Sequence, residues 1–186
     1  LGGFGWYFGN IFINPFASNE IYLNGIDLHY TSDRGQTWSV IDDFSVHADK
    51  HDMLFTGPGA FYLATDGGLY KTTNTGASWT DEDEIPNSQF YRVAASPHIP
   101  GEYYGGMQDN GTAFGNSLGL SSWLQIFGGD GFQPVFTQDA SDIVAEAQNG
   151  FLVYSTDNGF NWNPYLNGID GTDRTNWDQP IIHSQH

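Results

Sequence analysis

The chain has 186 residues, 39% of them hydrophobic and 16% aromatic, so it is long enough and apolar enough to fold around a core. Its 22 acidic and 5 basic side chains give a formal net charge of -17, so we expect no nucleic-acid partner, and an anionic membrane surface is a poor partner as well. The absence of cysteine excludes disulfides and thiolate metal sites, and no run of about 18 apolar residues indicates membrane insertion. No leader opens the sequence, so we expect any signal peptide to lie outside it.

From the N-terminus onward, short runs rich in β-branched and aromatic residues alternate with Gly, Asn and Asp clusters, without a sustained helical period. These runs predict antiparallel strands in groups of four. The first two groups are expected at 6–15, 20–25, 27–33 and 37–42, and at 51–57, 60–67, 68–74 and 78–83. The next two are expected at 90–97, 102–111, 112–117 and 121–127, and at 132–139, 143–150, 151–157 and 161–166.

An octet recurs between the third and fourth strands of three groups: TSDRGQTW at 31–38, TTNTGASW at 72–79 and STDNGFNW at 155–162. The octet tryptophans are Trp38, Trp79 and Trp162, and Trp123 falls between the last two, at steps of 41, 44 and 39 residues. Self-similarity at such a period indicates a repeat architecture. The sequence therefore predicts four units of one pattern, the third without its octet.

Four short antiparallel strands at a period of about forty residues are the signature of a β-propeller blade. We predict an all-β fold with blades at 1–43, 44–84, 85–127 and 128–167. The segment 168–186 contains NWDQPIIHSQH, which echoes FQPVF at 132–136 and predicts the innermost strand of a further blade. Because a lone strand would leave an open edge, we expect a larger propeller of seven or more blades, with a closed four-bladed ring as the alternative.

Each octet has the composition of a tight turn. An Asp or Asn side chain can accept nearby backbone N–H bonds, Gly tolerates positive φ, and the tryptophan can cover the turn. Asn74 stands where the other octets have aspartate, which a hydrogen-bonding role tolerates and an acid catalyst does not. We therefore expect structural roles for Asp33, Gly35, Trp38, Asn74, Gly76, Trp79, Asp157, Gly159 and Trp162.

The octets match the Asp-box, or BNR, repeat (S/T-x-D-x-G-x-T/S-W) of sialidases, xyloglucanase-type glycoside hydrolases, photosystem II assembly factors and the sortilin domain. Together with VHADKHDMLF, QFYRVAASP, YYGGMQDNGT and GGDGF, they resemble sortilin-like (VPS10-like) bacterial secreted propellers often labelled glycosyl hydrolases. The resemblance covers nearly the whole chain and implies a propeller at the cell surface or outside the cell. It implies little about activity, because enzymes and non-enzymes share Asp boxes.

In a blade, the octet turn between strands three and four lies at one end of the sheet. The loop between strands two and three and the link to the next blade lie at the opposite, top end. The top segments are expected to be the loops 24–27, 65–68, 108–111 and 148–150, the blade links 47–51 and 127–131, and the segment around Arg174. Propellers keep ligand sites on such rims. The predicted ligand-binding residues are His47, Asp49, His51, Asp66, Gln108, Asp109, Asn110, Asp130, Gln148 and Asn149.

The cluster of candidate metal ligands is formed by His47, Asp49 and His51. At alternating positions of an extended segment they would face the same way, as ligands of zinc, manganese or iron do. Alternatively, the two histidines hydrogen-bond neighbouring loops and fix the blade junction, or serve as acid and base.

Asp66, Asp109 and Asp130 lie in glycine-rich turns, so turn geometry or hydrogen bonding between blades is one interpretation of them. They are also candidates for sharing a calcium ion or another divalent cation, and weak candidates for the paired carboxylates of glycoside hydrolysis. Gln108 and Asn110 suit a sugar hydroxyl or a peptide backbone equally well.

Aromatic residues recur near the start of each innermost strand, where they can stack on a pyranose ring or pack between blades. They are Trp6, Tyr7, Phe90, Tyr91, Phe132 and Trp177. We therefore expect a secreted or cell-surface binding module for a glycan, peptide or protein, with a glycoside hydrolase as the alternative. A sialidase is disfavoured, because its arginine triad would need Arg34, Arg92 and Arg174 together and Arg34 lies inside an octet.

Overall fold

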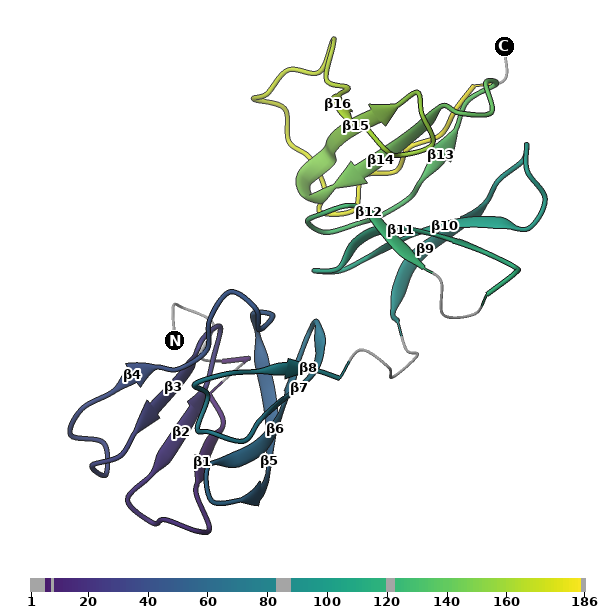
Figure 1. The fold of residues 1–186 in the computed structure, drawn as a ribbon. Helices are drawn as coiled ribbons and strands as arrows, with labels where there is room; N and C mark the ends of the chain where they lie inside the picture. Colours follow the sequence, from purple (N-terminus) through teal and green to yellow (C-terminus); the bar gives the residue numbers. More distant parts are fainter. Residues whose placement is uncertain (1–5, 8, 83–87, 120–122, 185–186) are drawn as a thin grey trace. The chain divides into compact units, whose positions relative to one another are not determined.

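The computed structural model describes residues 6–7, 9–82, 88–119 and 123–184. It divides into two compact units, Leu1–Ile85 and Pro86–His186, each described by itself below (Figure 1). Among the described residues, all regular structure is β apart from one short 3-10 turn, Gln148–Gly150. The predicted all-β class is therefore confirmed.

Unit 1 contains two four-stranded antiparallel sheets, each a simple meander in chain order. Blade 1 comprises β1 (Ile11–Ile13), β2 (Ile21–Asn24), β3 (Leu28–Thr31) and β4 (Ser39–Val40). Blade 2 comprises β5 (Lys50–Gly57), β6 (Ala60–Thr65), β7 (Gly68–Thr72) and β8 (Thr80–Asp81).

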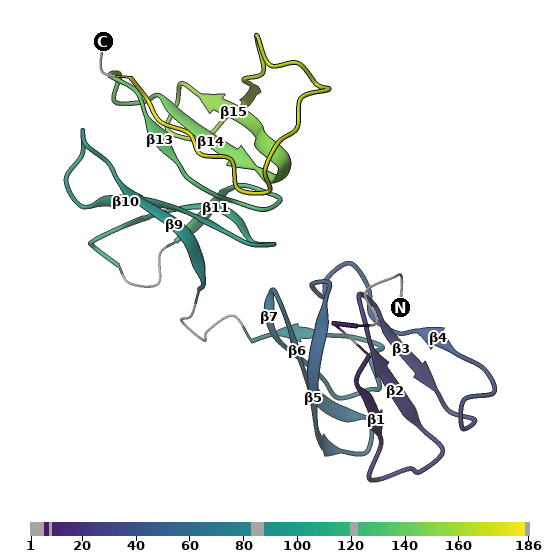
Figure 2. The ribbon, with the colours of Figure 1, turned by 180° about the vertical axis from the view of Figure 1, so that it is seen from behind.

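Unit 2 repeats this arrangement, as the view from behind also shows (Figure 2). Blade 3 comprises β9 (Phe90–Ala95), β10 (Glu102–Met107), β11 (Gly111–Asn116) and β12 (Leu124–Phe127). Blade 4 comprises β13 (Val135–Phe136), β14 (Ile143–Ala147), β15 (Phe151–Ser155) and β16 (Asn163–Pro164). Four four-stranded antiparallel meanders are the blades of a propeller fold.

The strands lie within the expected ranges to within one residue, but several are shorter. β13 is only two residues long because Pro134, directly before it, has no N–H for the ladder. The parts of the expected strands at 83 and 121–122 lie outside the described residues, as does the expected blade boundary at 84 and 85. The blade and domain boundaries stay a prediction.

Residues 176–184 form no strand in the structure, and the further blade expected at 168–186 stays a prediction. A strand requires a paired neighbour, and this segment contacts unit 2 mainly through side chains and single backbone bonds. In both ribbon views it runs alongside β14 (Figure 1 and Figure 2).

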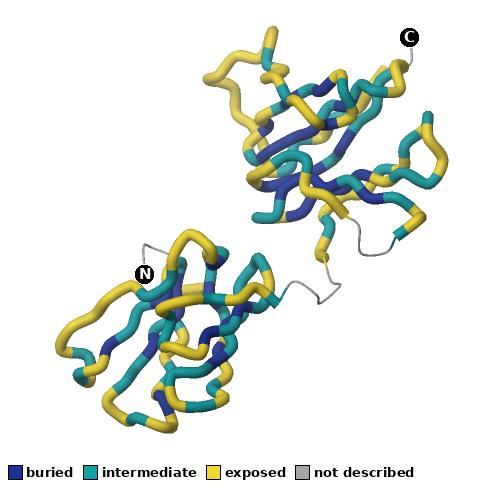
Figure 3. Tube along the Cα trace, viewed as in Figure 1, coloured by how far each residue is buried: buried dark blue, intermediate teal, exposed yellow. Residues whose placement is uncertain are grey.

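The core of unit 1 lies between its two sheets, where buried residues alternate with less buried ones along β2, β6 and β7 (Figure 3). In register across blade 2, Met53, Leu63 and Tyr70 are buried toward blade 1. From blade 1, Tyr22 meets Phe61 edge on, with ring centroids 5.1 Å apart. Period-two patterning of these middle strands therefore creates a shared apolar layer between the two blades.

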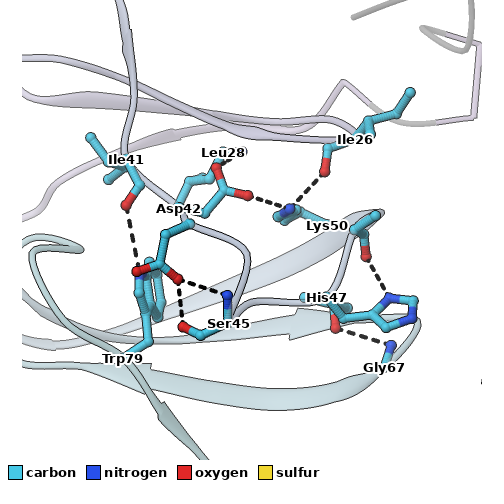
Figure 4. Close-up of polar contacts among 12 residues, drawn as sticks. Ile26, Leu28, Ile41, Asp42, Ser45, His47, Lys50, Gly67 and Trp79 are labelled. Carbon is cyan, nitrogen blue, oxygen red and sulfur yellow. Dashed lines mark hydrogen bonds and ion pairs between the residues drawn. The ribbon is translucent and has the colours of Figure 1, made fainter.

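A buried ion pair also joins the blades of unit 1 (Figure 4). Lys50, at the start of β5, contacts the carboxylate of Asp42, and both side chains are at most 5% exposed. Lys50 Nζ donates to the Ile26 carbonyl at 2.6 Å, while Asp42 Oδ1 accepts from the Leu28 N–H at 2.8 Å. These bonds fix the link between β4 and β5, which carries His47, at the top of the unit.

Unit 2 has a separate core. The Tyr104 ring meets Phe136 of the next blade edge on at 5.2 Å, and Phe132 is fully buried. Gly106 in β10 packs so closely on the link that an added Cβ would lie 2.1 Å from the Phe132 carbonyl oxygen. A glycine is therefore needed there for the β12–β13 link to reach the top of blade 3.

Candidate functional site

The first octet is a hydrogen-bonded turn organised by two side chains. Thr31 Oγ1 donates to Asp33 Oδ1 at 2.7 Å and accepts from the Gly35 N–H at 3.0 Å. Asp33 Oδ1 also accepts from the Thr37 backbone N–H at 2.9 Å. Hydrogen bonds from the Thr37 and Thr31 hydroxyls and from this backbone N–H lower the pKa of Asp33 to about 2.

The other two octets repeat these bonds. Asn74 Oδ1 accepts from the Ser78 N–H at 2.9 Å, and Asp157 Oδ1 accepts from the Asn161 N–H at 2.8 Å. Since an amide and a carboxylate serve alike, the position needs an acceptor rather than a charge. The fifth residue of each octet has φ between 82° and 89°, the left-handed region that favours glycine: Gly35, Gly76 and Gly159.

The octet tryptophans differ in their partners. Trp79 Nε1 donates to the Ile41 carbonyl of the preceding blade at 3.4 Å (Figure 4), and Trp162 Nε1 donates to the Ile126 carbonyl at 2.7 Å. Trp38 Nε1 donates within its own turn, and its side chain is 44% exposed. Trp79 and Trp162 therefore connect blades, whereas Trp38 covers only its own turn.

The predicted cluster at the top of unit 1 is built differently from the sequence-based expectation. Asp49 has φ of 64°, so the backbone is not extended there and strand alternation does not align His47, Asp49 and His51. His51 Nε2 instead lies 2.5 Å from Asp66 Oδ1, in the β6–β7 loop. The alternation premise is wrong, and metal binding by these residues stays a prediction.

The histidines and aspartates of unit 1 nevertheless share one corner. His47 lies over Gly67, where an added Cβ would be 2.3 Å from the His47 Cγ. Carboxylate oxygens of Asp49 and Asp66 lie within 4.8 Å of each other. Burial raises the pKa of Asp49, the Asp66 charge raises it further, and positive charge at neighbouring groups partly offsets both. Such a corner suits a cation or a hydrogen-bond donor from a ligand.

Asp130 connects three loops at the top of unit 2. Its Oδ1 accepts from the Asp109 N–H at 2.9 Å, and its own N–H donates to Gln148 Oε1 at 3.2 Å. Asp109 has φ of 58°, a turn conformation that this bond supports. Asp130 is only 5% exposed, so its carboxylate holds the rim together rather than facing solvent.

Beside this junction lies a platform of side chains on blades 3 and 4. The Tyr91 ring stacks on buried Phe132 at 5.4 Å, with 8° between the ring planes. The Tyr91 hydroxyl donates to Gln108 Oε1 and accepts a hydrogen bond from the Trp177 side chain. Phe132 also meets the Trp177 ring edge on at 6.0 Å. Tyr91, Gln108 and Trp177 are exposed; we call these three residues the aromatic platform.

The other predicted residues take lesser roles. Asn110 Nδ2 donates to the Gln108 carbonyl at 3.0 Å, and the Asn149 N–H donates to the Trp177 carbonyl at 3.2 Å. The Phe90 ring packs on Trp123 at 4.9 Å within blade 3. These contacts order the loops around the aromatic platform.

Glu146 was not singled out by the sequence analysis, although it is fully buried in β14. Its Oε1 accepts from the Gln179 N–H at 2.6 Å, while its Oε2 has no hydrogen-bond partner among the described residues. Burial raises its pKa to about 7. The signal was present as a lone acid between small apolar residues in IVAEA, at 143–147.

No protein-family model and no curated protein matches this chain. Among solved structures it is similar to YCF48 bound to D1 peptide, at 16% identity over 82% of this chain and 66% of that one, with a TM-score of 0.36. It is also similar to the GH74 enzyme of Niastella koreensis, at 15% identity over 83% of this chain and 28% of that one, with a TM-score of 0.37. A third similar structure is the GH74 xyloglucanase of Xanthomonas campestris, at 18% identity over 87% of this chain and 30% of that one, with a TM-score of 0.37.

The chain thus spans 66% of the YCF48 chain and less than a third of either GH74 chain. Within the described part of the chain, we find no helix with the length and apolar character needed to cross a membrane.

Proposed function

We propose that this chain is part of a secreted or cell-surface β-propeller that binds a glycan, a peptide or a protein through its top loops. The aromatic platform of unit 2 would hold the ligand. The corner formed by His47, Asp49, His51 and Asp66 in unit 1 would be a second, separate polar contact region. The remaining blades of a larger propeller would lie outside this sequence.

The observation that carries this proposal is that contacts within the aromatic platform hold its side chains in fixed positions. Tyr91 and Trp177 present exposed rings with polar atoms, the combination that suits sugar C–H faces and peptide groups. Phe132 supports both rings, and hydrogen bonds join Tyr91 to Gln108 and Trp177. Because these side chains are already ordered, binding loses little rotamer entropy.

The burial and hydrogen bonding of the carboxylates in unit 2 favour binding over hydrolysis. A glycosidase needs two carboxyl groups that face the substrate from opposite sides. In unit 2, Asp130 is buried and bonded to the Asp109 backbone, and Glu146 is fully buried. Asp109 and Asp178 are partly exposed, but Asp178 is paired with Arg92.

The test is to screen the protein against an oligosaccharide array and an immobilised peptide library, with a reducing-sugar assay on every oligosaccharide that binds. We expect binding without release of reducing sugar. Tyr91→Ala and Trp177→Ala should each weaken binding by about tenfold or more, or about 1.4 kcal/mol. Tyr165→Ala is the matched control, because Tyr165 is also exposed but lies beyond β16.

Equal binding by wild type and both platform variants would overturn the platform assignment. Release of reducing sugar that disappears in Asp109→Asn would instead support the glycoside hydrolase alternative.

A further inference from the structure

Residues 175–179, which we call the rim strap, lie across the top of blade 4 without belonging to a strand. Individual hydrogen bonds, rather than a strand ladder, hold this segment in place. The Asn149 N–H donates to the Trp177 carbonyl at 3.2 Å, Arg92 Nη2 donates to Asp178 Oδ2 at 2.5 Å, and the Gln179 N–H donates to Glu146 Oε1 at 2.6 Å. The Glu146 contact is the only one of these three that uses a fully buried acid.

Glu146 is poorly solvated beneath the strap. Its Oε1 receives one backbone N–H, and its Oε2 receives no hydrogen bond from the described residues. A buried carboxylate usually needs several donors or a direct ion pair. Arg92, whose positive charge lowers the pKa of Glu146, forms its ion pair with Asp178 instead. The closed arrangement therefore suits a neutral carboxyl better than a charged one.

We propose that the rim strap is a proton-controlled latch, which closes on blade 4 when the Glu146 carboxyl takes up a proton and loosens when it releases that proton. Trp177 belongs both to the strap and to the aromatic platform, so opening the strap would dismantle the platform. The latch itself is independent of any ligand, but its effect on binding rests on the proposed function.

The direction follows from the charges around Glu146. Burial raises its pKa from 4.5 to about 7; the Gln179 N–H lowers it, the Asp178 charge raises it and Arg92 lowers it. Opening the strap admits water and returns the pKa toward its ordinary value. Closure is thus most favourable at low pH and weakens as the pH rises to about 7, by at most about tenfold per pH unit for one linked proton.

Hydrogen–deuterium exchange of the intact protein between pH 5 and pH 8 tests the latch, with rates corrected for the intrinsic pH dependence measured on the unfolded chain. In the wild type, we expect protection of residues 175–179 to fall from pH 5 to about pH 7 and then level off. Glu146→Gln cannot ionise and should keep the same protection throughout. Asp139→Asn, at an exposed turn between β13 and β14, should behave as the wild type.

A second variant tests the mechanism through the pH at which half of the strap protection is lost. Asp178→Asn removes the charge that raises the pKa of Glu146 and frees Arg92, so the loss of protection should move to lower pH. Strap protection in the wild type that does not change with pH, or a pH dependence that persists in Glu146→Gln, would overturn the latch. Neither outcome depends on whether the platform binds a glycan or a peptide.

Discussion

At the residue scale, the buried charged side chains of the described residues differ in how they are neutralised. Lys50 has an ion-pair partner and a carbonyl, Asp130 accepts from a backbone N–H, and Glu146 keeps one carboxyl oxygen without a donor. The desolvation cost of a buried charge depends on such partners. Burial of a charged side chain therefore costs a different amount of free energy at each of these three positions.

Lys50→Met should destabilise unit 1 strongly, because it leaves Asp42 buried without its cation. Removing one member of a buried pair typically costs about 3–5 kcal/mol. Denaturant unfolding followed by circular dichroism measures this loss. Lys71→Met, whose ammonium lies over the Tyr62 ring at 5.3 Å, should cost about 1 kcal/mol or less. Equal losses in both variants would contradict a special role for the pair.

Glu146→Gln should change how stability depends on pH. The folded-state pKa of Glu146, about 7, lies above its ordinary 4.5, so its stabilising contribution is complete below pH 4.5 and is lost as the pH rises through 7. The loss is on the order of 3 kcal/mol, at about 1.4 kcal/mol per pKa unit. Unfolding free energies at pH 5 and pH 8 should therefore differ less in Glu146→Gln than in the wild type.

The matched control is again Asp139→Asn, which should keep the wild-type difference between the two pH values. An unchanged difference in Glu146→Gln would mean that Glu146 does not control this pH dependence.

At the element scale, the octet turn is stabilised by a hydroxyl that accepts and donates at once. Thr31→Val keeps the shape of the side chain but leaves the Gly35 N–H without its acceptor. Because Thr31 is 1% exposed, we expect a loss of about 1–3 kcal/mol in unfolding free energy. Thr56→Val, at an exposed position of β5, should change it by less than about 0.5 kcal/mol. A Thr31→Val protein as stable as this control would contradict the role.

The octet tryptophans should also differ in their contribution to stability. Trp79 packs on Phe61 with ring centroids 5.6 Å apart and bonds to the preceding blade, so Trp79→Ala should cost roughly 3 kcal/mol. Trp38→Ala should cost about 1 kcal/mol or less, because that ring covers only its own turn. Melting temperatures of the two variants make the comparison. A larger loss from Trp38 would show that it has a partner beyond its turn.

At the scale of the whole molecule, the net charge of -17 opposes compaction through self-repulsion. Sodium chloride should therefore raise the melting temperature as it screens these charges. Calcium chloride at equal ionic strength separates screening from specific binding. An additional rise that disappears in Asp49→Asn would support a cation site beside Asp66, whereas equal curves would remove it. A melting temperature unchanged by salt would contradict the repulsion itself.

The sequence by itself determined the blades and their octet turns. Period-two patterning, Gly and Asn clusters and the Thr31–Asp33–Gly35 spacing act over a few residues, so they can be interpreted without knowing distant neighbours. The sequence also showed aromatic residues near the start of each innermost strand, of which Phe132 is buried and Tyr91 and Trp177 are exposed.

Only the tertiary structure decided which rim residues are exposed. The Lys50–Asp42 pair, the Asp130 junction and the Glu146 contact with Gln179 join segments that are separate in the sequence. The bend at Asp49 likewise removed an alignment that the local pattern predicted. Burial and pairing depend on what packs against a side chain, and that information lies in the neighbouring blade rather than in the strand.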